Sequence, residues 1–112
     1  MAFTTAALNA AIDAALTGVT HASLHTGDPG AAGTNNDSGE TRAAVTGVGG
    51  ATGAADTLTG TWTISGAGGP FTHYGLWTAV TAGTFVNSGT LTPNETFAGA
   101  GTLDFTINVT AT

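Results

Sequence analysis

Three histidines are the residues of this sequence best suited to binding a metal ion. His21 and His25 fall on one alternating segment, THASLHT, and His73 lies at the start of another, THYGLWT. Zinc can be held by three imidazoles, but residues i and i+4 of one strand lie roughly 13 Å apart. His21 and His25 are therefore too far apart to share an ion. We expect the histidines to form hydrogen bonds, and we predict no metal site.

Three acidic residues lie in or beside a loop-forming segment, GDPGAAGTNNDSG, at residues 27–39. They are Asp28, Asp37 and Glu40, and two asparagines of the segment, Asn35 and Asn36, add to the likeness of its composition to that of a calcium loop. EF-hand ligands fall at alternate positions before a bidentate glutamate, and that spacing is absent. We expect the acids to be structural, with calcium binding as the alternative.

Asp28-Pro29-Gly30 predicts a tight turn at the start of this segment. Aspartate favours the first position of a turn, proline fixes φ at the next, and glycine accepts a positive φ. A loop as long as residues 27–39 is usually functional or an interface arm.

Serine and threonine are abundant, but no nucleophilic site can be recognised. The elbow motif Gly-x-Ser-x-Gly is absent. The glycine-rich stretch at residues 66–69 lacks the Lys-Ser/Thr of a phosphate loop. We predict that the chain is not an enzyme and has no cofactor.

The large aromatic residues are better explained as core than as a binding platform. Trp62, Tyr74 and Trp77 lie in segments that alternate like strands, and rings usually fill the core of a small β domain. Glycan binding is the alternative, and it requires several exposed rings. We expect Trp77 to be core and His73 to make a structural hydrogen bond. Gly75, which lies between them, indicates a close approach on that face of the strand.

Positive charge is almost absent. Arg42 is the only lysine or arginine in 112 residues, against seven acidic residues, which gives a net charge of −6. Binding to nucleic acid or to an anionic membrane requires several basic residues, so both partners are excluded. Charged residues make up 7% of the chain, where about a quarter is usual. A surface of hydroxyls and small apolar groups suits a subunit covered by its neighbours.

Residues 4–16 are the only segment that predicts a helix. Thr4 or Thr5 can cap its start, and Leu8, Ile12 and Leu16 form one apolar stripe. The stripe is narrow, so we expect the helix to lie on a sheet or to pack against another copy. No signal peptide and no apolar run of about 18 residues is present.

The rest of the chain predicts strands and loops, and one domain accounts for residues 1–112, with a helix at 1–18 and a β domain at 19–112. Six short strands with glycine-rich turns are typical of an antiparallel β-sandwich or barrel, so the fold class is mainly β with one N-terminal α-helix. Residues 102–110 alternate without interruption, and we expect them to form a strand central to the sheet. The other expected strands are residues 20–26, 42–48, 56–65, 72–78 and 84–88.

Two motifs resemble those of small structural virion proteins of tailed bacteriophages, especially phages of actinobacteria. The first is SLHTGDPG at residues 23–30, followed by Gly33 and Arg42, and the second is THYGLW at residues 72–77. The helical segment LNAAIDAAL resembles the same family. The chain departs from the family around residues 35–41, where it is shorter and lacks the aromatic residue before Arg42. The resemblance covers nearly the whole chain.

This resemblance implies a non-enzymatic virion protein without a cofactor. Our leading interpretation is a minor capsid or decoration protein that binds the major capsid protein and stabilises its lattice. The alternatives are a minor tail or tail-fibre component and a host-surface glycan-binding module. We expect a homo-oligomer, with a trimer favoured by closed symmetry. The candidate interface residues are Phe3, Leu8, Ile12, Asp28, Pro29, Gly33, Asn35 and Asn36, and the structural motif residues are His25, Arg42, His73, Gly75 and Trp77.

Overall fold

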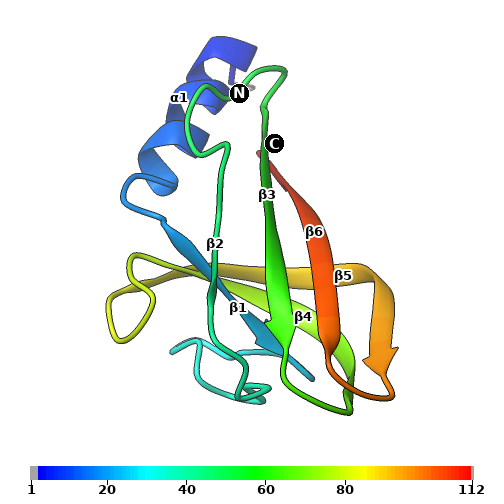
Figure 1. Ribbon diagram of the computed structural model, residues 1–112. Coiled ribbons are helices and arrows are strands. Elements are labelled where there is room, and N and C mark those ends of the chain that lie inside the picture. Colours follow the sequence, from blue (N-terminus) through cyan, green and yellow to red (C-terminus); the bar gives the residue numbers. More distant parts are fainter. Residues whose placement is uncertain (1–2, 112) are drawn as a thin grey trace.

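The computed structural model describes residues 3–111, which form one helix and six strands (Figure 1). In chain order they are α1 (Thr5–Ala15), β1 (His21–His25), β2 (Ala43–Ala44), β3 (Ala55–Ile64), β4 (Gly68–Trp77), β5 (Phe85–Phe97) and β6 (Gly101–Thr110). All strand pairs are antiparallel. The expected fold class, mainly β with one N-terminal helix, is confirmed.

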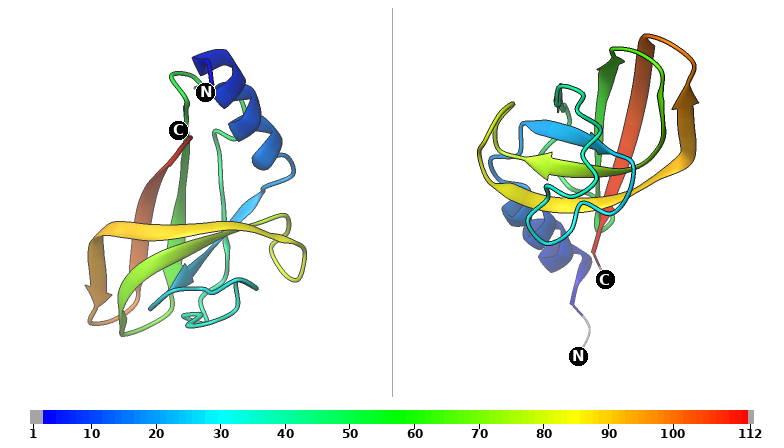
Figure 2. Two further views of the ribbon diagram at one scale, coloured as in Figure 1. Left: turned by 180° about the vertical axis from the view of Figure 1, so that it is seen from behind. Right: turned by 90° about the horizontal axis from the view of Figure 1, so that it is seen from below.

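The strands form two sheets that are joined on one side and separate on the other. One sheet has the order β2-β1-β4-β5, and the second consists of β3 and β6. Just after β2, Thr46 and Thr59 exchange two backbone hydrogen bonds of 2.9 and 3.0 Å, which link the two sheets. Figure 2 shows β5 following β4 for most of its length and bending toward β6 near its end. The result is an open barrel whose gap lies between β5 and β6.

The core lies between the two sheets. Trp62 of β3 is fully buried, and its indole N–H donates to the carbonyl oxygen of Ala22 in β1 at 2.9 Å. Phe105 of β6 packs on the same indole, with ring centroids 4.2 Å apart. The hydrogen bond satisfies the one polar atom of the indole, so the ring can lie in the core without a desolvation penalty.

Helix α1 closes one end of this core. The hydroxyl of Thr4 accepts the N–H of Ala7 at 3.1 Å, as a helix N-cap does. Gly18 follows the last turn with φ +84°, a conformation that glycine adopts without strain. Ile12 and Leu16 are buried in the core, so the predicted apolar stripe is the face that packs on the sheets.

Two polar residues on the same side of α1 hold the loop that precedes β3. Asn9 accepts the N–H of Ala54 at 2.8 Å, and Asp13 accepts the N–H of Ala51 at 3.0 Å. Each bond satisfies a backbone donor that no strand partner reaches. The helix is thus fixed to the β domain by polar contacts as well as by burial.

Three expectations about strands need correction. The segment 102–110 was expected to be central, but among residues 3–111 β6 pairs only with β3 and is an edge strand. Its alternation reflects one buried face, and a buried face does not require partners on both edges. The strand expected at residues 42–48 is only Ala43–Ala44, because the backbone changes partner at Thr46, which bonds to Thr59 of β3, and Gly47 then takes a positive φ. The strand expected at 84–88 begins at Phe85 and continues to Phe97.

Candidate functional site

The two sequence motifs meet on the outer face of β1 and β4, away from the core between the sheets. Ser23 and His25 of β1 lie beside Gly75 and Trp77 of β4, and all four residues are buried. The cover comes from the loop at residues 26–40, which folds back along β1. We call these four residues the motif layer.

A directed chain of hydrogen bonds runs through the motif layer. The indole N–H of Trp77 donates to Ser23 Oγ at 2.9 Å, and Ser23 Oγ lies 2.6 Å from His25 Nε2. His25 Nδ1 lies 2.9 Å from the carbonyl oxygen of Asn35, which can only accept. Nδ1 of His25 therefore carries a proton; in the neutral imidazole, Nε2 then accepts and the Ser23 hydroxyl donates to it. The chain holds the loop at Asn35 against β1.

This serine–histidine pair is structural and not a nucleophile with its base. Ser23 and His25 are 1% and 0% exposed, so no substrate can reach the hydroxyl. The Ser23 oxygen already accepts the indole N–H, and its proton is held by His25. A nucleophile needs open space in front of its oxygen.

Arg42 covers the outer side of Trp77. Its guanidinium carbon lies 3.7 Å from the ring centroid, and Nη1 donates to the carbonyl oxygens of Ala79 and Ala82 at 3.0 and 2.7 Å. Desolvation lowers the pKa of Arg42 from its ordinary value, while the nearby charge of Asp37 acts in the opposite direction. The only basic side chain is therefore occupied in holding the loop between β4 and β5.

The acids of the loop each stabilise a separate piece of backbone. Asp28 accepts the N–H of Gly30 at 2.9 Å, and Gly30 has the positive φ predicted for this turn. Asp37 accepts the N–H of Gly39 at 2.8 Å. The carboxylate of Glu40 accepts the N–H and the hydroxyl of Ser65 at 2.7 and 2.6 Å. These bonds match the expected structural role.

The three histidines do not lie together at one site. His25 and His73 are cross-strand partners, whereas His21 lies at the other end of β1, opposite Trp77. His73 Nδ1 lies 2.8 Å from the hydroxyl of its neighbour Thr72, which is a local hydrogen bond of the expected kind. Within residues 3–111, no group of three or more histidine, aspartate or glutamate side chains could hold a metal ion.

The candidate interface residues divide into exposed and buried groups. Phe3 is 67% exposed at the start of α1. The expectation that Ile12 offers an uncovered apolar contact is wrong, because it is 3% exposed within the core. Pro29 and Gly33 are also buried, the latter against the ring of Phe85. Leu8 is half-buried, and the remaining candidates, Asp28, Asn35 and Asn36, are exposed on the loop.

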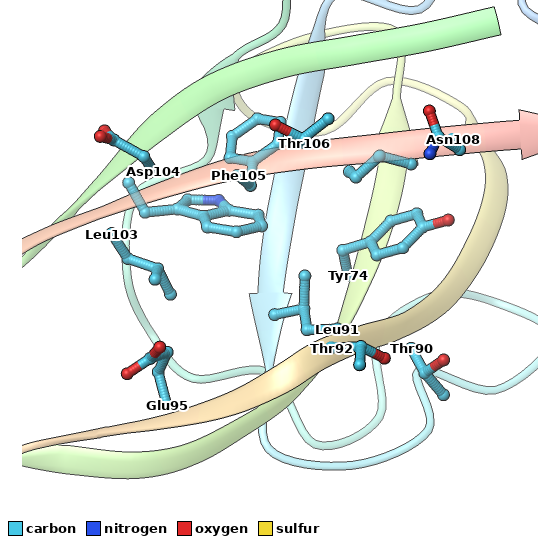
Figure 3. A pocket seen from close by; sticks show the side chains of 12 residues that line it. Tyr74, Thr90, Leu91, Thr92, Glu95, Leu103, Asp104, Phe105, Thr106 and Asn108 are labelled. Carbon is cyan, nitrogen blue, oxygen red and sulfur yellow. The ribbon is translucent and has the colours of Figure 1, made fainter.

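A groove that the sequence did not predict lies in the gap between β5 and β6. Its volume is about 360 Å³. Leu91 of β5, Leu103 of β6 and Tyr74 of β4 point into it, as Figure 3 shows. Glu95 and Asp104 lie at the same end of the groove. Sequence analysis missed it because the groove exists only where two strands fail to pair, and alternation does not show pairing.

Tyr74 is a titratable side chain that lines this groove. Burial raises the pKa of its hydroxyl above the ordinary value of 10.0. The phenol is therefore neutral at physiological pH, and its ring contributes an apolar wall.

No helix among the described residues is long and apolar enough to cross a bilayer; α1 has 11 residues.

Fold and site together define a small β-rich structural module, in which the motif residues maintain a surface loop and an open groove lies elsewhere. The chain matches the family described as podophage GP4 fiber I protein gp80 over residues 2–111, and it belongs to that family. It is thus a bacteriophage structural protein of the virion, as the motifs indicated. The actinobacterial host stays a prediction. Neither a curated protein nor a solved structure matches the chain.

Proposed function

We propose that this protein is a non-enzymatic tail-fibre component of a short-tailed phage. The observation that carries the proposal is the match to a podophage fibre family over residues 2–111. It supports the tail-fibre alternative over the capsid-decoration interpretation, which has no finding of its own in its favour. In this role the domain acts by adhesion to other virion proteins.

The arrangement of the domain supports such a role. Helix α1 and the end of β6 lie at one end of the molecule, and the loop at residues 26–40 lies at the other (Figure 1). The principal extents are 47 × 27 × 23 Å, so the domain is elongated. One end can therefore contact a neighbouring subunit while the loop is presented away from it.

Self-association through α1 fits this geometry. Apart from the residues packed on the sheets, the helix exposes only threonine and alanine, with Phe3 just before it. An uncharged face can meet its own copy without like-charge repulsion. A cyclic trimer, in which the same patch repeats around a three-fold axis, is the arrangement we favour.

Antibodies raised against the purified protein test the assignment on intact phage particles. Electron microscopy should show label on the tail fibres, at sites repeated around the tail. Label distributed over the capsid shell would refute the fibre assignment and restore the decoration interpretation. Light scattering on the purified protein tests the trimer separately, and a Phe3→Ser variant should shift the mass toward the monomer.

A further inference from the structure

The β6 strand offers a continuous, unguarded edge. It pairs with β3 through ten consecutive residues without a bulge, and within residues 3–111 it has no second neighbour. Native sheets protect such edges with lysine, proline, bulges or a covering segment. β6 contains neither lysine nor proline. Its outer row of backbone N–H and C=O groups is therefore available to another strand.

The facing strand β5 is different. Between the pairs His73–Thr90 and Phe71–Glu95, β5 holds more residues than β4, which is a bulge. A bulge bends a strand and interrupts its edge. β5 therefore serves as a wall of the groove and not as a second pairing edge. Leu91, Leu103 and Tyr74 provide apolar contacts on the floor, and Glu95 and Asp104 place negative charge at one end (Figure 3).

We propose that an extended peptide segment carrying lysine or arginine binds this groove and adds a strand to the free edge of β6. Backbone hydrogen bonds would supply affinity, and alternate side chains would enter the groove, as in β-augmentation generally. Apolar side chains of the segment contact Leu91, Leu103 and Tyr74. A basic side chain of the segment reaches Glu95. Asp104 lies on the other face of β6, where its Oδ1 accepts the hydroxyl of Thr61 at 2.6 Å, and it adds negative charge beside the edge. The proposal depends on the proposed function only in taking another virion protein as the source of the segment.

A second copy of this chain does not meet these requirements. The chain has no lysine, and its one arginine, Arg42, is bound to the carbonyl oxygens of Ala79 and Ala82. A copy would therefore bring no free lysine or arginine side chain to Glu95 and Asp104. Glycans fit less well, because Trp62 and Phe105 in the floor are 0% and 6% exposed and offer no open ring face.

The test uses the whole protein and a synthetic peptide of about seven residues in which valine and lysine alternate. Amide chemical-shift changes on titration should concentrate in β6, and hydrogen exchange of β6 amides should slow. Methylating alternate backbone nitrogens of the peptide should weaken binding at least about tenfold, because it removes two or more hydrogen bonds. A valine–glutamate peptide should not bind.

Two protein variants test the charge contribution. Glu95→Gln should weaken binding about two- to fivefold, the range of an exposed ion pair. Asp13→Asn is the matched control, since it removes one negative charge far from the groove and keeps an acceptor for the Ala51 N–H; binding should be unchanged.

Three results would overturn the proposal. The methylated peptide could bind as tightly as the unmethylated one, the chemical-shift changes could be confined to strands other than β6, or two copies of the protein could pair through β6 without peptide. Failure of the fibre assignment would leave peptide binding intact, so antibody labelling and peptide titration separate the two claims.

Discussion

A methyl group at position 75 is the sharpest steric test of the motif layer. In Gly75→Ala the added Cβ would lie 2.6 Å from Ser23 Oγ, 3.1 Å from Trp77 Nε1 and 3.2 Å from a ring carbon of Phe85. Ser23 cannot give way freely, because its oxygen is held by both Trp77 and His25. The backbone at position 75 has no positive φ, so the strain comes from packing and not from the main chain.

The expected cost of Gly75→Ala combines three effects. Overpacking a buried site costs about 1–3 kcal/mol. Each disturbed hydrogen bond in the series that links Trp77, Ser23 and His25 costs about 0.5–1.5 kcal/mol. Alanine recovers about 0.4–1 kcal/mol by restricting the unfolded chain. We therefore expect a net loss of about 2–4 kcal/mol in the free energy of unfolding. For a domain of this size the melting temperature should fall by about 8–15 °C.

Urea denaturation and thermal melting of Gly75→Ala and of a control variant, Gly99→Ala, measure this loss of stability. Gly99→Ala is the control, because its added Cβ meets nothing within 4 Å and its φ is not positive. That variant should be unchanged or slightly more stable. Hydrogen exchange should also show faster exchange of the Thr26 and Ser38 amides in Gly75→Ala, since Thr26 donates to Asn36 across the loop and Ser38 donates to Leu24 of β1. Equal stability of Gly75→Ala and Gly99→Ala would refute the account of the motif layer.

Four further changes give distinct outcomes. Trp77→Ala should lower the free energy of unfolding by about 3–5 kcal/mol in urea denaturation, as large aromatic truncations do in cores. An unchanged midpoint would show that the ring does not contribute to stability. Arg42→Lys keeps the charge but loses the planar stacking on Trp77 and the hydrogen bonds to two carbonyl oxygens, so the free energy of unfolding should fall by about 1–2 kcal/mol. Ile12→Ala should cost about 2–4 kcal/mol, and a variant of wild-type stability would show that α1 is not anchored by this side chain. Because burial raises the pKa of Tyr74, the unfolded phenol, with a pKa of about 10, ionises first. Stability should fall as pH rises above about 10, and Tyr74→Phe should reduce that fall in alkaline thermal melts.

The fold could be predicted from the sequence where one face of a segment is buried. Helix α1 and strands β3 and β6 all have periodic apolar residues, and each was found within one or two residues of its predicted bounds. Pairing could not be predicted, because alternation records which side chains are buried and not which backbone edges have partners. β6 shows this directly, since it alternates without interruption and still has no partner on its second edge in the part of the chain that the structure describes.

The site was predictable only in part, for a related reason. The motif residues indicated close packing near Gly75, and the structure places Ser23, His25 and Trp77 around it. That Asn35 would be held through its carbonyl oxygen could not be predicted, since any residue supplies that atom. The groove between β5 and β6 depends on a bulge in β5 and on the absence of a strand, and neither has a signature in residue types.

The motifs that identify the family therefore differ from the surfaces that would recognise a partner. Ser23, His25, Gly75 and Trp77 are buried, and they act by fixing the loop that covers them. The surfaces proposed for partners are others: the exposed side chains of the loop, the outer face of α1 and the edge of β6. Substitutions of the buried motif residues should lower the stability of the domain, and every binding activity should be lost when the domain unfolds. Substitutions of the exposed residues on these surfaces should change binding alone, because those side chains contribute little to the core.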